Sequence, residues 1–196
     1  MKSQYKSLAS FIIIITAAVL FQGCVNYEQE TTFSADGSGI MKIHYWSQMN
    51  NFSMGTNLGK FDFDEQQVIN NYSGPYTSVS NLKIEDNLTD STKHVSFVLN
   101  FTDIKKISDA KGLRDVSVSW EEGSDGMKFK YIQLKDTSAA NSMVSNDYTV
   151  TYTFDMPGDV ISTNAYKKIG STLLWMYKVS DLKNDLEMTA TVAVKK

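Results

Sequence analysis

The thiol of Cys24 is the first side chain to consider for chemistry, because it is the only cysteine among 196 residues. A thiol acts as a nucleophile, a metal ligand, a disulfide partner or an attachment point for a lipid. A single cysteine excludes a disulfide within the chain. Cys24 also comes just after fifteen uncharged residues, 8–22, which follow the basic start MKSQYK. Its position therefore favours a role in targeting over a role in catalysis.

Residues 1–23 have the pattern of a secretory signal peptide, with two lysines, an apolar stretch and a small residue before the cleavage point. The apolar stretch is shorter than the roughly 20 residues of a membrane-spanning helix. The sequence at the cleavage point, LFQGC (residues 20–24), resembles the lipobox of bacterial lipoproteins. The resemblance implies that residues 1–23 are removed and that the Cys24 thiol receives a diacylglycerol. The alternative is an ordinary signal peptide whose cysteine is incidental.

Acylation at Cys24 predicts a protein of the cell envelope whose first partner is the membrane. Two or three acyl chains, such as palmitate, anchor a protein stably, whereas one chain does not. Residue 25 is Val rather than Asp, and by resemblance to the sorting rules of two-membrane bacteria this favours the outer membrane. With Cys24 acylated, no thiol remains for a cysteine nucleophile or a thiolate metal site.

His44 and His94 are the only histidines and the next candidates for a general base or a metal ligand. Each alternates out of phase with the apolar positions around it, which places it on the solvent face of a strand. Two histidines on separate strands, without thiolates, are a weak basis for a zinc site. We interpret both as solvated strand residues and predict neither a metal nor a cofactor.

Carboxylates gather at residues 62–65, 85–86 and 121–122, and paired carboxylates can hydrolyse glycosides. These pairs, however, lie at expected turns and helix starts, where capping and solubility account for them. The sequence has no nucleophile elbow, phosphate-binding loop or EF-hand calcium loop. Its four Ser-x-x-Lys matches lack the Lys-Thr-Gly partner motif. The sequence therefore predicts that the protein is not an enzyme.

Removal of the 23 signal residues and their two lysines leaves 173 residues, with 17 basic and 22 acidic side chains. That length suits a single domain, residues 24–196, with a sizeable core. All but one of the basic residues are lysines, although sites that grip anions usually use arginine. The charges are mixed along the chain and form no basic patch, so nucleic acid is not an expected partner.

Short runs of alternating apolar and polar residues predict β-strands along most of the mature chain. Asp36-Gly37 between the first two runs predicts a hairpin. Short helices are predicted at 64–69, where Asp64 is the N-cap, and at 103–113. The predicted strands span 27–34, 40–46, 76–88, 92–102, 115–121, 127–134, 148–154, 160–162, 173–179 and 186–194.

This order of elements predicts an α+β fold dominated by an antiparallel, curved β-sheet of about nine or ten strands with two short helices. So many strands curl into a half-barrel or split into two packed sheets. The first strand pattern begins at Tyr27, three residues after Cys24. At about 3.3–3.6 Å per extended residue, the domain lies within roughly 10 Å of the lipid headgroups.

Residues 47–63 are expected to form a long loop with apolar content. A curved sheet with this loop over its mouth would enclose an apolar pocket. The alternative is a filled core beneath the loop. The candidate ligand-binding residues are Met49, Phe52, Met54, Leu58 and Phe61.

Three parts of the chain together resemble the LppM-like family of bacterial lipoproteins. They are the start at Cys24, the early hairpin at 35–39, and the segment FDMPGDV (154–160) that leads to Thr163-Asn164 and Leu174-Trp175. The resemblance extends over most of residues 24–194. It implies an α+β domain comparable to lipid-binding folds, a role in binding lipid or glycolipid at the cell envelope, and no catalytic residues.

We therefore expect a lipid-anchored, non-catalytic protein of the cell envelope that binds a lipid or another apolar ligand at the membrane surface. The alternative is a scaffold or assembly lipoprotein that holds a membrane protein through an exposed sheet edge or loop.

Overall fold

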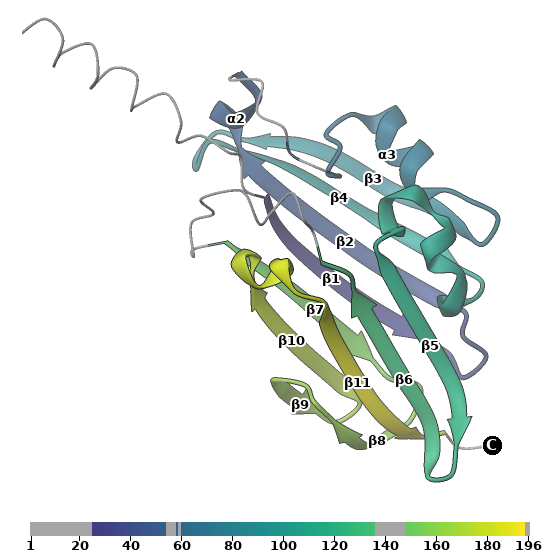
Figure 1. Cartoon of the computed structure of the whole chain (residues 1–196). Helices are drawn as coiled ribbons and strands as arrows, with labels where there is room; N and C mark the ends of the chain where they lie inside the picture. Colours follow the sequence, from purple (N-terminus) through teal and green to yellow (C-terminus); the bar gives the residue numbers. More distant parts are fainter. Residues whose placement is uncertain (1–24, 54–57, 59, 136–147, 195–196) are drawn as a thin grey trace, which may run out of the picture.

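The computed structural model describes residues 25–53, 58, 60–135 and 148–194, which form two β-sheets and several short helices (Figure 1). The large sheet has seven strands in the order β3-β4-β2-β1-β7-β10-β9, and the small sheet has four in the order β5-β6-β11-β8. Their bounds are β1 Val25–Phe33, β2 Gly39–Gln48, β3 Thr77–Asn87, β4 Thr92–Phe101, β5 Val116–Gly123, β6 Gly126–Gln133, β7 Thr149–Asp155, β8 Asp159–Thr163, β9 Lys167–Ile169, β10 Thr172–Lys178 and β11 Leu186–Ala193.

The predicted α+β class is confirmed, and the described strands pair antiparallel except β1 with β7, which are parallel. The strands split into two sheets, one of the two expected arrangements. Each predicted strand exists, and β9 is the strand that the prediction missed. Its three residues are all exposed and carry no apolar alternation, so only their pairing with β10 defines the strand.

Helices occupy the positions that the capping residues predict, with two corrections. α3 (Glu65–Tyr72) begins after Asp64, whose side chain accepts a 3.0 Å hydrogen bond from Gln67 N. The predicted helix at 103–113 is instead two 3₁₀ turns, Ile104–Asp109 and Lys111–Leu113, because Ala110 between them has an extended backbone. The predicted loop at 47–63 is also too long, because β2 continues to Gln48 and α2 spans Met49–Ser53.

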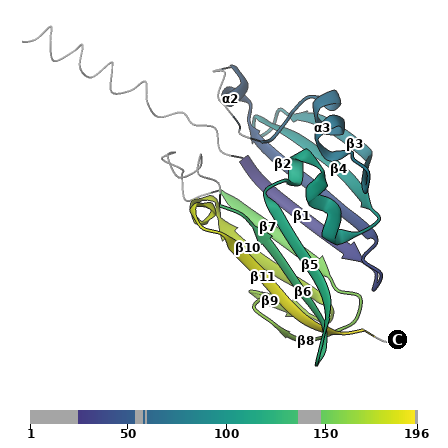
Figure 2. The same cartoon turned by 45° about the vertical axis from the view of Figure 1, so that its right-hand side comes forward.

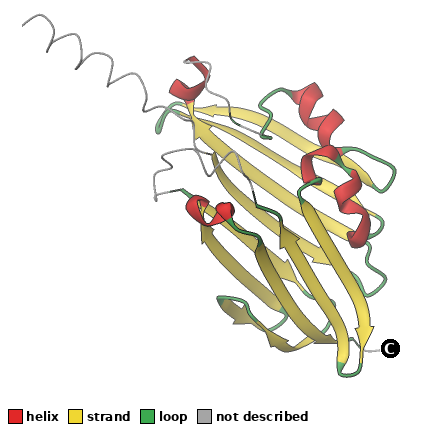
Figure 3. Cartoon of the chain, viewed as in Figure 1, coloured by secondary structure: helices red, strands yellow, loops and turns green. Residues whose placement is uncertain are grey.

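The small sheet and the helices cover one face of the large sheet (Figures 2 and 3). Phe129 of β6 lies 4.9 Å, between ring centroids, from Phe154 of β7. On the other half, Tyr72 of α3 lies 4.7 Å from Phe97 of β4. Both halves belong to one hydrophobic cluster. No element of the described ranges covers the opposite face of the large sheet, here called the outer face (Figure 2).

A polar group lies inside this core, between the two sheets. Gln29 of β1 is 1% exposed; its Oε1 accepts hydrogen bonds from the hydroxyls of Tyr27 (2.9 Å) and Tyr131 (3.3 Å). Its amide donates to Thr31 Oγ1 at 3.0 Å. Burial raises the pKa of Tyr131 well above its usual value, so its hydroxyl stays a donor. Every buried side-chain polar atom of the described residues has a hydrogen-bond partner, so burial of this polar group leaves no donor or acceptor unsatisfied.

Strand register places the turn between β3 and β4, residues 88–91, at the same end of the large sheet as the start of the domain. Val25 pairs with Ser47, Ser47 pairs with Lys93, and Lys93 pairs with Asp86. We call this part of the large sheet the Val25 end. The turn between β5 and β6 lies at the opposite end of the molecule (Figure 1). β1 begins at Val25, directly after Cys24 and two residues earlier than predicted.

Candidate functional site

Two of the predicted apolar ligand-binding residues pack against the core. Leu58 and Phe61 are partly buried against it. The Phe61 ring lies 5.9 Å from the ring of Tyr27 and 5.1 Å from that of Tyr45. These two side chains therefore cover the inner face of the large sheet.

The other predicted residues continue this cover toward the Val25 end. Phe52 of α2 makes an edge-to-face contact with Phe63 at 4.7 Å, and Lys93 Nζ lies 5.8 Å from the Phe52 ring. Met49 and Phe52 are both half-buried. The structure thus brings Met49, Phe52, Leu58 and Phe61 to one region. Cys24 and Met54 lie outside the described residues.

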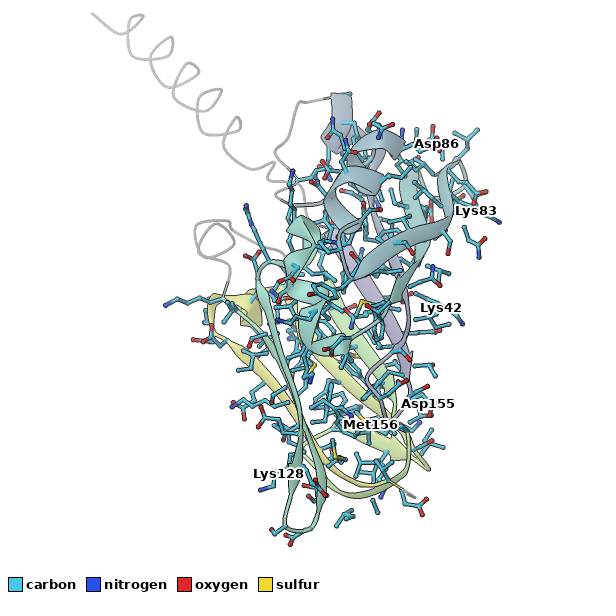
Figure 4. All side chains as sticks on the ribbon, turned by 90° about the vertical axis from the view of Figure 1, so that its right-hand side faces the viewer. Lys42, Lys83, Asp86, Lys128, Asp155 and Met156 are labelled. Carbon is cyan, nitrogen blue, oxygen red and sulfur yellow. The ribbon has the colours of Figure 1, made fainter. Side chains whose placement is uncertain are left out.

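On the outer face, charged side chains of neighbouring strands surround a shallow depression of about 370 Å³. Figure 4 shows Lys42 and Lys83 on this face, pointing away from the small sheet. Lys42 Nζ lies 3.4 Å from Glu30 Oε2, with both side chains largely exposed. The residues lining the depression include Glu28, Glu30, Lys42, His44, Lys83 and Ser96.

The two histidines form one connected hydrogen-bonded group at the edge of this depression. His44 Nε2 and His94 Nδ1 are 2.9 Å apart, and their rings are near-parallel, at 16°. His44 Nδ1 lies 3.3 Å from Glu28 Oε2, and His94 Nε2 lies 2.7 Å from Thr92 Oγ1. Thr92 in turn donates to Asp90. We call these five residues the histidine chain.

The acid at one end sets the direction of the hydrogen bonds. Because the Thr92 hydroxyl donates to Asp90, its oxygen accepts from His94 Nε2–H. His94 Nδ1 is then the acceptor for His44 Nε2–H. A further proton on His94 Nδ1 requires His44 to carry its own proton on Nδ1, where that N–H faces Glu28 Oε2, so that His44 Nε2 becomes the acceptor. The Trp46 ring is near-parallel to both imidazoles, with ring centroids 4.7 Å from His44 and 5.7 Å from His94.

The prediction that both histidines are solvated strand residues did not include the contact between them. They lie on the outer face, as predicted, but they bond to each other. Register decides this: Trp46 pairs with His94, and His44 sits two residues away on the same face of β2. The pattern His-x-Trp on one strand was visible in the sequence, but nothing local shows that the facing strand supplies a second histidine.

Burial and neighbouring His44 lower the pKa of His94, against a weaker opposing effect of Asp90 and Glu85. A base with a lowered pKa takes up protons less readily when folded, so protonation favours the unfolded chain. We expect the free energy of unfolding to fall as pH drops from about 6.5, the ordinary histidine value, through the lowered pKa of His94. Urea denaturation between pH 8 and 5 measures this. His94→Gln should show a shallower decline than wild type, and equal slopes would contradict the prediction.

Three neighbouring residues on the outer face are of the types found in a catalytic triad, but they do not have the geometry of one. Glu28, His44 and Ser96 are cross-strand neighbours on β1, β2 and β4. His44 Nε2, however, is engaged with His94, and no hydrogen bond joins it to Ser96 in the described part of the chain. Those residues also include no group of three or more potential metal ligands.

Similarity to a solved structure supports the architecture. The chain matches the NMR structure of the folded domain of LppM from Mycobacterium tuberculosis with a TM-score of 0.54, over 91% of this chain and 95% of that one. The fold is LppM-like. The two sequences are 17% identical, so the likeness concerns the fold. No protein-family profile matches the chain, and no curated protein matches it significantly.

Within the described ranges, no helix is both long and apolar enough to cross a membrane.

Proposed function

We propose that the protein is a lipid-anchored, non-catalytic component of the cell envelope that binds a lipid or another apolar ligand close to the membrane. The observation that carries this proposal is the meeting of two features at the Val25 end. β1 begins directly after Cys24, the residue expected to carry the acyl chains. The half-buried apolar side chains of Met49 and Phe52 lie at the same end. The LppM-like fold supports the same proposal.

The acylated Cys24 is the proposed membrane attachment. Val at position 25 supports the outer membrane as the destination if the cell has two membranes. Neither a cofactor nor a nucleic acid is part of the proposal.

Native mass spectrometry of residues 25–196, purified without detergent, tests ligand binding. We expect an added mass in the lipid range that is lost on denaturation. Phe52→Asp should lower the fraction of bound protein, because a carboxylate opposes an apolar ligand at the Val25 end. Ile169→Asp, at the exposed edge strand β9, is the matched control and should leave that fraction unchanged. A ligand-free mass for the wild type would contradict lipid binding.

The open outer face favours a second candidate, a scaffold that holds a membrane protein. Its depression presents both signs of charge, a pattern that selects partners by complementarity. A photo-crosslinker at Lys83 would then give one dominant protein adduct in cells, and one at Lys128, on the small sheet, would not. Equal labelling from both positions would count against this candidate.

A further inference from the structure

The turn between β3 and β4 presents an apolar side chain to solvent at the Val25 end. Leu88 is 81% exposed, more than any other large hydrophobic residue of the described ranges. A single exposed leucine requires no special role by itself. Leu88 is distinguished by its position at the Val25 end and by the hydrogen bonds that hold its turn.

Hydrogen bonds hold this turn in a defined shape. Thr89 N donates to Asn87 Oδ1 at 3.0 Å, and Thr92 N donates to Asp90 Oδ1 at 3.2 Å. Met49 N, at the start of α2, donates to Ser91 O at 2.8 Å. The turn is therefore fixed to the neighbouring helix, and Leu88 is held outward instead of folding back onto the sheet.

Charge and aromatic content around the turn suit a zwitterionic bilayer. Lys93 and Asp86, which pair across the hairpin, lie 3.7 Å apart and offset each other. Trp46 of β2 pairs with His94 of β4, which pairs with Glu85 of β3, so the three residues lie side by side across the sheet. Glu85 is three residues before Leu88, so this row lies about 10 Å from Leu88 along the strand, at roughly 3.3 Å per residue. Tryptophan favours the headgroup region of membranes. With Leu88 at the acyl boundary, Trp46 lies at headgroup depth.

We propose that the β3–β4 turn is a second membrane contact, with Leu88 inserted at the boundary between headgroups and acyl chains. This rests on the proposed function, because the acylated Cys24 brings the Val25 end to the bilayer. One leucine does not hold a protein on a membrane, but it orients one that is already anchored. The contact directs the strands of the large sheet away from the membrane and leaves the histidine chain close to its surface.

The test uses the full acylated protein in phosphatidylcholine vesicles, with an environment-sensitive fluorophore on Leu88→Cys. Acylation of Cys24 leaves the new cysteine as the free thiol. Ser124→Cys, in the turn between β5 and β6 at the opposite end, is the matched control. Both sites are exposed, so neither substitution removes packing. Vesicles containing phosphatidylcholine brominated on its acyl chains quench only fluorophores that reach the acyl region.

We expect the label at position 88 to lose most of its emission and the label at 124 to keep it. If the protein floats with the vesicles but both labels keep their emission, or both lose it equally, the turn is not a membrane contact, although the anchor stands. If the protein does not float with the vesicles, the anchor fails and the inference fails with it. Flotation and quenching thus separate the two proposals.

Discussion

Replacing Cys24 by serine is expected to abolish lipid attachment completely. The serine hydroxyl offers no thiolate to form the thioether, so the variant should incorporate no labelled palmitate. Without acylation the precursor should also keep residues 1–23, so its mass should be that of the unprocessed 196-residue chain. Metabolic labelling and intact mass measure both effects. Each acyl methylene contributes about 0.8 kcal/mol to membrane binding, so losing two chains removes the anchor entirely.

The control restores a thiol elsewhere. In Cys24→Ser combined with Ser124→Cys, an exposed cysteine is present but lacks the preceding LFQG sequence. This double variant should remain unlabelled. If either variant takes up palmitate, or if the single variant is processed to the wild-type mass, the lipoprotein assignment is incorrect and Cys24 is incidental.

Phe154→Ala is expected to cause the largest loss of stability among single substitutions in the core. Phe154 is fully buried and joins the two sheets: its ring lies 4.9 Å from Phe129, 5.2 Å from Tyr131 and 5.9 Å from Trp175. Truncating a buried phenylalanine to alanine costs about 3–5 kcal/mol. That is a large part of the free energy of unfolding of a single domain, which is about 5–15 kcal/mol. Guanidinium denaturation should show a correspondingly lower midpoint.

A variant that keeps most of the volume separates packing from misfolding. Phe154→Leu should lose clearly less stability than Phe154→Ala, because the remaining cavity is smaller. Val160→Ala, on the small sheet at β8, offers a second comparison with fewer atoms removed. If Phe154→Ala loses no more stability than Phe154→Leu, the packing of this ring between the two sheets does not carry the stability proposed for it.

Much of the secondary structure is local and was predictable. The alternation Val95, Phe97, Leu99, Phe101 predicts a strand with one buried face, and all four side chains are buried. Gly37 has φ +88°, the conformation that favours glycine in a hairpin turn. The strand β9 was not predictable, because three exposed residues have no pattern of their own.

The candidate site was only partly predictable. The sequence indicated which apolar residues follow β2, but it did not distinguish a loop that lines a pocket from one that packs on the core. Phe61 contacts the tyrosines of β1 and β2, which only the register brings beneath it. The histidine chain was missed for the same reason, since His44 and His94 are fifty residues apart and meet through the β2–β4 pairing.

Taken alone, the sequence determined the targeting prediction at Cys24, the α+β class, the order of most elements and the buried face of each strand. These depend on composition and on residues a few positions apart, which set backbone torsion angles and amphipathic period. The tertiary structure alone decided that β1 pairs in parallel with β7, that the strands divide into two sheets, and that the turn carrying Leu88 lies at the same end of the large sheet as Val25. Strand pairing joins distant segments through backbone hydrogen bonds that are alike for every sequence, so the choice of partner depends on the packing of the whole core.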